Sequence, residues 1–271
     1  MGKLVNITVC GAGGRMGRRI IALAEENGLR VTGALEAPGH PALGQDAGLA
    51  AGVAASGVTI GDDLKASWTK GAVIVDFSSP AATLAQLEFA AGNGAPVVVG
   101  TTGLDSEQHA RAEELAARTA TVMASNMSVG ITVLDSLVEQ AVKALGAGFD
   151  CEVLELHHRL KKDAPSGTAL SLAATAAAAR GLELPVSLAT AREGMIGERP
   201  DNEIGVVALR GGDAVGDHTV MLVGTGERLE LTHRAASRDC LAGGALRAAL
   251  WVAGRQPGLY GMRQVCGLEP A

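Results

Sequence analysis

The sequence predicts an α/β fold: a Rossmann-like doubly wound parallel sheet, followed by an α+β unit with an open mixed sheet. Strand-like and helical segments alternate five times up to residue 145, which is typical of a parallel sheet covered by helices. A glycine-rich turn separates the first strand from the first helix. Beyond residue 145 the order becomes strand, helix and three strands, so a second architecture begins there.

The expected strands of the first half are short apolar runs at residues 4–10, 29–35, 71–77, 95–99 and 121–124. The third run is continuously apolar, as expected for a parallel strand buried on both faces. Pro80 falls in a first helical turn, Asp62 could cap a short helix, and Asp105 with Gln108 resembles a capping box. Ligands bind beyond the carboxyl ends of such strands, so we expect the loops there to face one crevice.

Residues 11–17 read G-A-G-G-R-M-G, and Glu36 follows Gly17 by 19 residues at the end of the second strand. The glycines let backbone N–H groups approach a pyrophosphate, and the helix N-terminus adds its positive end. A carboxylate in the place of Glu36 can accept hydrogen bonds from both ribose hydroxyls. The third glycine stands one position later than in the usual fingerprint, but the arrangement still favours dinucleotide binding over a plain tight turn.

In the second half we expect a helix at 129–145, a strand at 151–157, a helix at 169–180 and an irregular stretch at 182–204. Strands follow at 205–209, 217–223 and 228–233, the last two antiparallel because a tight Gly-Thr-Gly turn joins them. Ser237 is the expected cap of a final apolar helix, which would suit the outer face of the first sheet.

Residues 155–170 read E-L-H-H-R-L-K-K-D-A-P-S-G-T-A-L, the densest polar stretch of the chain. Strand alternation places Glu155 and His157 on one face and His158 on the other, beside leucines. His157 therefore suits proton chemistry and His158 suits substrate contact, the alternative for His158 being a hydrogen-bonded, half-buried residue. Lys161 could neutralise a substrate carboxylate or deliver a proton, whereas Arg159 and Lys162 read as solvated charges.

The Ser166-Gly167-Thr168 step stands where a helix begins, so its hydroxyls and free N–H groups can receive a carboxylate. An ordinary N-cap is the alternative, and both can hold together. Two adjacent histidines do not have the spacing of a helical metal site, so no metal is expected. The residues alone thus predict a reductase or dehydrogenase with a nicotinamide cofactor and a small carboxylated substrate.

Bulk properties exclude several other classes of protein. The net charge is −6 and aromatic residues make up 2%, which argues against a general nucleic-acid binder. The four cysteines are far apart and form no C-x-x-C, so a reducing, cytoplasmic compartment fits best. No apolar run reaches the ~20 residues of a membrane span, and no secretory leader is apparent.

Several motifs together carry a family resemblance: V-C-G-A-G-G-R-M-G at 9–17, V-V-G-T-T-G at 98–103, S-N-M-S-V-G at 125–130, E-L-H-H-R-L-K-K-D-A-P-S-G-T-A at 155–169, R-E-G at 192–194, G-E-R-P at 197–200, G-D-H-T at 216–219 and E-R-L-E-L-T-H at 227–233. They resemble the 4-hydroxy-tetrahydrodipicolinate reductase (dihydrodipicolinate reductase) family of bacterial lysine and diaminopimelate synthesis. The resemblance spans nearly the whole chain. It implies hydride transfer from NADH or NADPH to a cyclic dicarboxylate with loss of water.

By position, the resemblance implies that His157 is the catalytic acid/base and Lys161 the proton donor. It implies substrate contacts at His158, Ser166, Gly167 and Thr168. The implied cofactor contacts are Gly11, Ala12, Gly13, Gly14, Arg15, Met16, Glu36, Phe77, Gly100, Thr101, Thr102, Ala124, Ser125, Asn126 and Met127. The family also implies a homotetramer built through the sheets of the second domain, and a final helix that returns to the first. We therefore expect a dinucleotide domain of residues 1–127 and 238–271, and a substrate and tetramerisation domain of residues 128–237.

The sequence departs from the family pattern where members that grip the NADPH 2′-phosphate carry arginine. Ala37 follows Glu36, and Ser79 replaces another arginine, although Arg15 remains. Because a free carboxylate prefers ribose hydroxyls and repels a phosphate, we expect NADH preference or dual use.

Two further departures lie near the reacting groups. Met127 stands where the family usually has phenylalanine beside the nicotinamide, which puts stacking there in doubt. Leu160 replaces a third histidine of some members, so that histidine is dispensable.

Two alternatives remain open at the level of sequence. A non-catalytic dinucleotide-binding regulator would keep the glycine turn and Glu36 but would not need His157, Lys161 and the helix start together. Another amino-acid-pathway dehydrogenase, such as a semialdehyde or homoserine dehydrogenase, is a weaker candidate. The semialdehyde enzyme needs a nucleophilic cysteine, and none of the four lies beside the histidines in the sequence.

Overall fold

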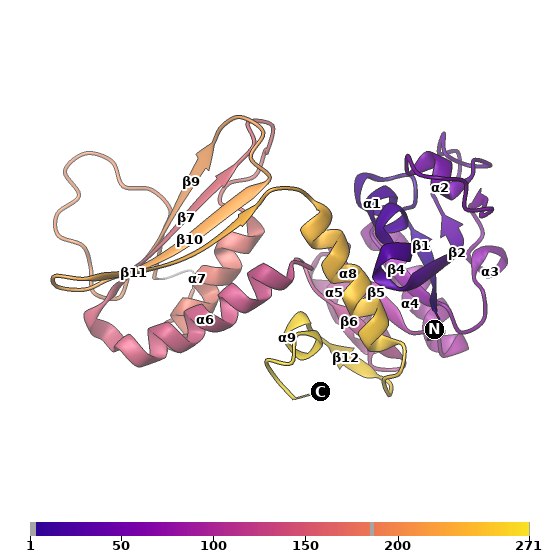
Figure 1. Cartoon of the computed structure of the whole chain (residues 1–271). Helices are drawn as coiled ribbons and strands as arrows, with labels where there is room; N and C mark the ends of the chain where they lie inside the picture. Colours follow the sequence, from indigo (N-terminus) through magenta and orange to yellow (C-terminus); the bar gives the residue numbers. More distant parts are fainter. Residues whose placement is uncertain (1–3, 185–186, 271) are drawn as a thin grey trace. The chain divides into compact units, whose positions relative to one another are not determined.

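The structure is a computed structural model that describes residues 4–184 and 187–270 (Figure 1). The chain forms two compact units. The first ends at Val129 and resumes at Arg238, and the second is Gly130–Ser237. Among the described residues, no helix is long and apolar enough to span a membrane.

The first unit contains a seven-stranded sheet in the order β12-β6-β5-β4-β1-β2-β3, with every neighbouring pair parallel. Its strands are β1 (Val5–Cys10), β2 (Leu29–Leu35), β3 (Ile60–Gly61), β4 (Val73–Asp76), β5 (Val97–Val99), β6 (Ala120–Met123) and β12 (Gly258–Tyr260). The predicted doubly wound sheet is confirmed. The two edge strands β3 and β12 were not expected from the sequence.

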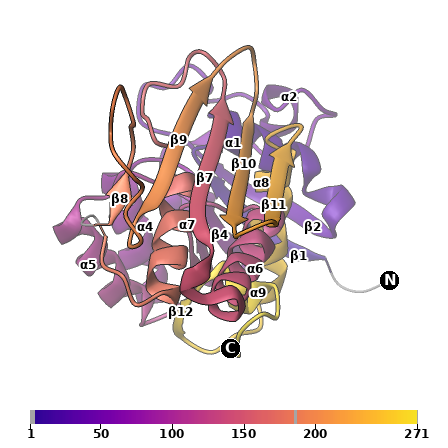
Figure 2. The same cartoon turned by 90° about the vertical axis from the view of Figure 1, so that its left-hand side faces the viewer.

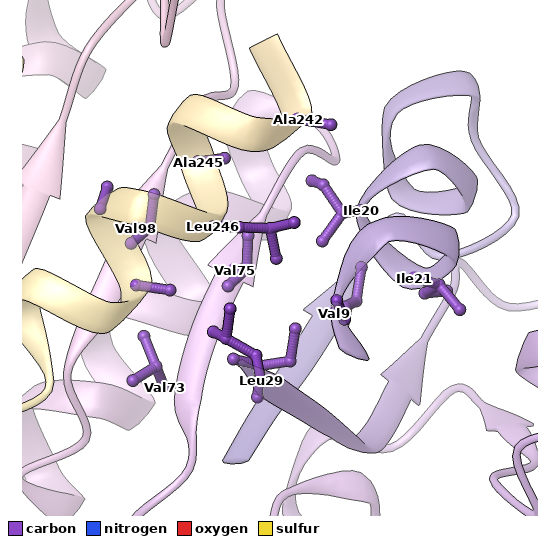
Figure 3. Packing of buried hydrophobic residues seen from close by; sticks show 14 of the residues in the cluster. Val9, Ile20, Ile21, Leu29, Val73, Val75, Val98, Ala242, Ala245 and Leu246 are labelled. Carbon is purple, nitrogen blue, oxygen red and sulfur yellow. The ribbon is translucent and has the colours of Figure 1, made fainter. Parts of the chain in front are cut away.

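Helices cover both faces of this sheet, which is why β4 reads as an apolar run buried throughout. On one face lie α1 (Arg15–Leu23) and α8 (Asp239–Val252), whose Ile20 and Leu246 pack against Val9 and Val75 (Figure 3). On the other face lie α4 (Pro80–Asn93) and α5 (Ser106–Ala116). The final long helix therefore does return to the first unit, as expected.

Short helical segments and caps complete the two units. The short segments are η1 (Glu25–Asn27), α2 (Ala47–Ala50), α3 (Leu64–Ser67), η2 (Gly146–Gly148) and α9 (Met262–Val265). The capping box of Asp105 and Gln108 is present at the start of α5. One predicted cap is wrong, because Asp63 and not Asp62 caps α3. α8 begins at Asp239, and Arg238 before it has helical dihedral angles and no side-chain cap hydrogen bond, so the cap expected of Ser237 stays a prediction.

The second unit is a five-stranded mixed sheet in the order β11-β10-β7-β9-β8. Its strands are β7 (Asp150–His157), β8 (Leu188–Ala189), β9 (Ile204–Arg210), β10 (Gly216–Val223) and β11 (Arg228–Ala235). β10 is antiparallel to its neighbours β11 and β7, whereas β9 is parallel to its neighbours β7 and β8. Two helices, α6 (Val129–Leu145) and α7 (Gly167–Ala179), cover one face (Figure 2). Along β7 and β10, buried residues alternate with half-buried ones, so the opposite face is open within this unit. The predicted open mixed sheet is confirmed.

Candidate active site

The carboxyl end of β7 carries Glu155 and His157 on the helix-covered face of the sheet. Glu155 is fully buried and His157 is 9% exposed. His158 follows the last residue of the strand and is half-buried. Its Nδ1 has no hydrogen-bond partner among the described residues. The alternation predicted from the sequence thus separates the buried Glu155–His157 pair from His158.

The carboxylate of Glu155 is the hub of a hydrogen-bond network. Arg210 donates to both of its oxygens, at 2.8 and 3.0 Å, and the backbone N–H of Ser166 donates to Oε1 at 3.0 Å. His157 Nδ1 lies 2.5 Å from Oε2. Burial works to raise the pKa of Glu155, but the hydrogen bonds from Arg210, His157 and Ser166 outweigh it and lower the pKa. An ionised carboxylate only accepts, so Nδ1 of His157 carries a proton and Nε2 is the atom free to exchange one.

Ser166 and His218 close this network on the side of α7. Ser166 is the N-cap of α7, and its Oγ accepts from the N–H of Ala169 at 3.2 Å. The same Oγ lies 3.2 Å from His218 Nε2. Burial, and then the neighbouring His157, lower the pKa of His218 to about 4, so its ring is neutral near pH 7. The Ser166 hydroxyl and a neutral His218 ring therefore share one hydrogen bond.

Lys161 lies in the loop between β7 and α7. Its Nζ is 2.8 Å from Asp163 Oδ2, and this contact lowers the pKa of Asp163. Its side chain is 20% exposed, whereas Arg159 and Lys162 are exposed, as the sequence indicated.

The first turn of α7 offers room for a ligand. Gly167 is its first residue, and a Cβ added there would meet no atom within 4 Å. Thr168 follows as the second residue. Open space beside the first N–H groups of this helix is the setting in which a carboxylate can be received.

In the first unit, the glycine turn joins β1 to α1. Gly11 has φ of +77°, and a Cβ there would lie 2.3 Å from the carbonyl oxygen of Phe77. α1 begins after Gly14, and no side chain caps it, so its first N–H groups have no side-chain acceptor. Glu36 accepts from the N–H of Gly13 at 2.8 Å and from the N–H of Ala37 at 2.9 Å. An uncapped helix N-terminus beside a close-packed glycine turn fits a dinucleotide pyrophosphate.

A buried aspartate that sequence reasoning missed organises the next two loops. Asp76, the last residue of β4, accepts from the hydroxyls of Ser78, Thr83 and Thr101, at 2.5, 2.5 and 2.9 Å. Thr101 Oγ1 also accepts from the N–H of Ser78 at 3.0 Å. The hydroxyl of Thr101 therefore joins the loops after β4 and β5 and does not point to solvent. Only the polar character of the strand's last residue could have signalled it.

The remaining predicted cofactor residues also follow strand ends. Gly100 follows β5, where a Cβ would lie 2.2 Å from the ring of Phe77, and Thr102 is exposed. After β6, Asn126 Oδ1 accepts from the N–H of Ser128 at 2.9 Å. Met127 is 1% exposed and belongs to the hydrophobic core, so a contact between this residue and a ligand would fall to its backbone. The structure thus places the predicted residues on the loops after β1, β2, β4, β5 and β6, except for Arg15 and Met16, which are the first two residues of α1.

Comparisons with known proteins cover nearly the whole chain. The family model described as dihydrodipicolinate reductase, N-terminus, matches residues 5–127, and its C-terminus model matches residues 130–266. A 4-hydroxy-tetrahydrodipicolinate reductase of Geobacter metallireducens is 49% identical over 98% of this chain and 100% of its own length. One from an Anaeromyxobacter species is 50% identical over 99% of this chain and 100% of its own length.

Among solved structures, a dipicolinate-bound dihydrodipicolinate reductase from Paenisporosarcina sp. TG-14 has a similar fold. Its TM-score is 0.74 at 22% identity, covering 95% of this chain and 97% of that one. The two family models, the full-length relatives and the observed pair of sheets agree. The chain therefore belongs to the dihydrodipicolinate reductase family.

Proposed function

We propose that this chain reduces 4-hydroxy-tetrahydrodipicolinate to tetrahydrodipicolinate in lysine and diaminopimelate synthesis. The observation that carries the proposal is the buried Glu155–His157 pair beside the open N-terminus of α7. The relatives that match over their full length are named as this reductase, which supports the proposal. In the balanced reaction, the hydroxyl group and one ring hydrogen leave as water, and a hydride and a proton enter the ring.

NADH or NADPH, held by the glycine turn and Glu36, would supply the hydride. The chain's own residues do the rest. His157 exchanges a proton through Nε2, because its Nδ1 is committed to Glu155. Lys161, whose Nζ pairs with Asp163, serves as the proton donor.

For the substrate carboxylate, we assign the donors to Gly167, Thr168 and His158. Ser166 was expected to share this task, but its N–H donates to Glu155 and its hydroxyl is hydrogen-bonded to His218. We therefore assign Ser166 the role of holding the first turn of α7 in place. Turnover of NAD(P)H with enzymatically generated substrate tests the function. Cofactor binding without turnover would instead support the regulator.

We further propose that NADH is used at least as well as NADPH. Ala37 is exposed and follows Glu36, whose carboxylate would repel a 2′-phosphate. The test is the ratio of kcat/KM for the two cofactors in the wild type and in Ala37→Arg. A charge-assisted hydrogen bond is worth about 1.5–3 kcal/mol, so Ala37→Arg should raise kcat/KM for NADPH by roughly 10- to 100-fold. A strong NADPH preference of the wild type would contradict this proposal.

A homotetramer in the cytoplasm completes the proposal. Val207 and Leu209 on the open face of the second sheet are 42% and 45% exposed, and half-buried Leu154 and Leu156 on β7 lie beside them. An apolar sheet face of this kind is suited to a second copy of the chain. Sedimentation should give four times 27.3 kDa, and a monomer would rule this assembly out. The four free cysteines support a reducing compartment.

No observation favours the two alternatives. A regulator without catalysis does not account for an ionised Glu155 aligned on His157. A semialdehyde dehydrogenase needs a reactive thiol. In the second unit Cys151 is fully buried, and burial raises its pKa to about 11, which makes it a poor nucleophile at neutral pH.

A further inference from the structure

We infer that Glu155, clamped by Arg210, is a positioning residue that links the proton chemistry of His157 to the first turn of α7. The inference rests on the proposed function in assigning proton transfer to His157. It adds a role for two residues that do not themselves touch the substrate. The three donors come from three places: the end of β7, the end of β9 and the start of α7.

The donors around Glu155 saturate its carboxylate. Each oxygen receives one N–H of Arg210 and one further donor, which is His157 Nδ1 at Oε2 and the Ser166 N–H at Oε1. Arg210 is itself fixed, because its Nη2 also donates to the carbonyl oxygen of Asp163 at 2.6 Å. A fully buried carboxylate is tolerated only with such partners, so its position is tightly determined.

The ring of His157 is held on its other side as well. A Cβ on Gly216 would lie 2.9 Å from His157 Nε2, so only glycine leaves that nitrogen open. The ring of His218 stands edge-on to it, with 5.2 Å between ring centroids. His218 is neutral near pH 7 and so presents no competing cation. Glu155 thus fixes both the tautomer and the ring orientation, as the buried aspartate does in a Ser-His-Asp triad.

The bond from Ser166 extends this control to substrate binding. Ser166 is the N-cap of α7, and its N–H donates to Glu155 Oε1. Gly167 and Thr168, where we place the substrate carboxylate, come next in the chain. A change in Glu155 should therefore lower kcat and raise KM together, since one carboxylate positions both the imidazole and the helix start.

The same strand offers a matched control. Glu152 lies on the opposite face of β7 and, like Glu155, accepts hydrogen bonds from arginine. Its donors are Arg192, at 2.7 and 3.0 Å, and Arg199, at 3.0 Å. The described structure shows no histidine bound to it. Glu152→Gln therefore removes a carboxylate–arginine pair of similar kind without touching His157. Its sedimentation must match the wild type, so that assembly is held constant.

The decisive experiment is a double-mutant cycle between Glu155→Gln and His157→Ala. Glu155→Gln alone should lower kcat/KM by about 10²-fold, the lower range of general acid–base contributions, with NADH binding retained. In the His157→Ala background the same change should cost only the part due to α7, about 10-fold or less, because coupled residues are non-additive. Equal losses in both backgrounds, or a similar loss in Glu152→Gln, would overturn the inference.

A second measurement needs neither turnover nor a variant. Two-bond ¹H–¹⁵N correlation spectra of histidine-labelled wild-type protein report which ring nitrogen carries the proton. We expect His157 in the Nδ1–H form when the ring is neutral. An Nε2–H form would overturn the inference even if the enzyme is active. Absent reductase activity with an Nδ1–H ring would reject the proposed function while supporting the positioning role.

Discussion

Replacing His218 with glutamine should make the protein's stability less sensitive to acid. His218 is 4% exposed, and its folded-state pKa is lowered to about 4 from an ordinary value of 6.5. Burial is the main cause. His157, His233 and Lys161 lower the pKa further, and Glu155 opposes them. The side-chain amide introduced by His218→Gln would keep a hydrogen-bond partner for the Ser166 hydroxyl but would bind no proton.

The magnitude follows from the difference between the folded and unfolded pKa. When folding lowers the pKa of a basic group such as histidine, the group favours the folded state only while it is neutral. Its contribution is complete above pH 6.5 and is lost as the pH falls towards 4. At pH 5 the unfolded histidine is charged and the folded one is mostly neutral, which costs the wild type about 2 kcal/mol relative to pH 7.

Urea unfolding at pH 7 and pH 5, at one fixed protein concentration, measures this contribution. The wild type should lose about 2 kcal/mol more than His218→Gln between the two pH values, since the other titrating groups are common to both proteins. Parallel losses in the two proteins would refute a neutral, buried His218. That result would also remove the argument that no cation stands beside His157.

Three other predictions concern the first unit. In thermal unfolding, Gly17→Ala should destabilise the protein by at least about 2 kcal/mol, because a Cβ there would lie 2.1 Å from the carbonyl oxygen of Gly11. The control is Gly92→Ala in α4, which has open space around it and should stabilise the protein by about 0.5–1 kcal/mol. Equal effects of the two substitutions would contradict the packing argument. Asp76→Ala leaves three hydroxyls without their shared acceptor, so the free energy of unfolding should fall by about 3 kcal/mol. NADH binding, measured by fluorescence titration, should also become weaker. Unchanged binding would show that this network does not hold the cofactor loops. Hydrogen bonds, chiefly from the N–H groups of Ser56 and Leu49, lower the pKa of Asp46 to about 2. The stabilising effect of this carboxylate is therefore present above pH 4 and is lost as the pH falls to 2. Over that range, the Tm of Asp46→Asn should fall less than the Tm of the wild type.

The elements that could be predicted from the sequence are those whose signal is local. β4 and β5 are apolar runs, and the box of Asp105 and Gln108 begins α5, so both kinds of element are visible in neighbouring residues. β3 and β12 have two and three residues, and only pairing with β2 and β6 makes them strands. No local pattern specifies such pairing.

The site shows the same limit. Alternation along one strand placed Glu155 beside His157 from sequence alone. Arg210 and His218 reach them because β9 and β10 flank β7 in a register that pairs Arg210 with His157 and His218 with Glu155. This register is set by packing between segments some 50 residues apart, which the sequence of β7 does not contain. The role of Ser166 changed for the same reason, because both of its expected free groups have partners in the fold.

The most direct test of the proposed mechanism is the turnover of His157→Ala and Lys161→Ala, with His109→Ala as the matched control. His109 is an exposed histidine of α5, with 57% of its side chain accessible. Both site variants should lose roughly 10²- to 10⁴-fold in kcat with NADH binding unchanged, whereas His109→Ala should turn over like the wild type. Wild-type kcat in both His157→Ala and Lys161→Ala would contradict the assignment of proton transfer to the end of β7.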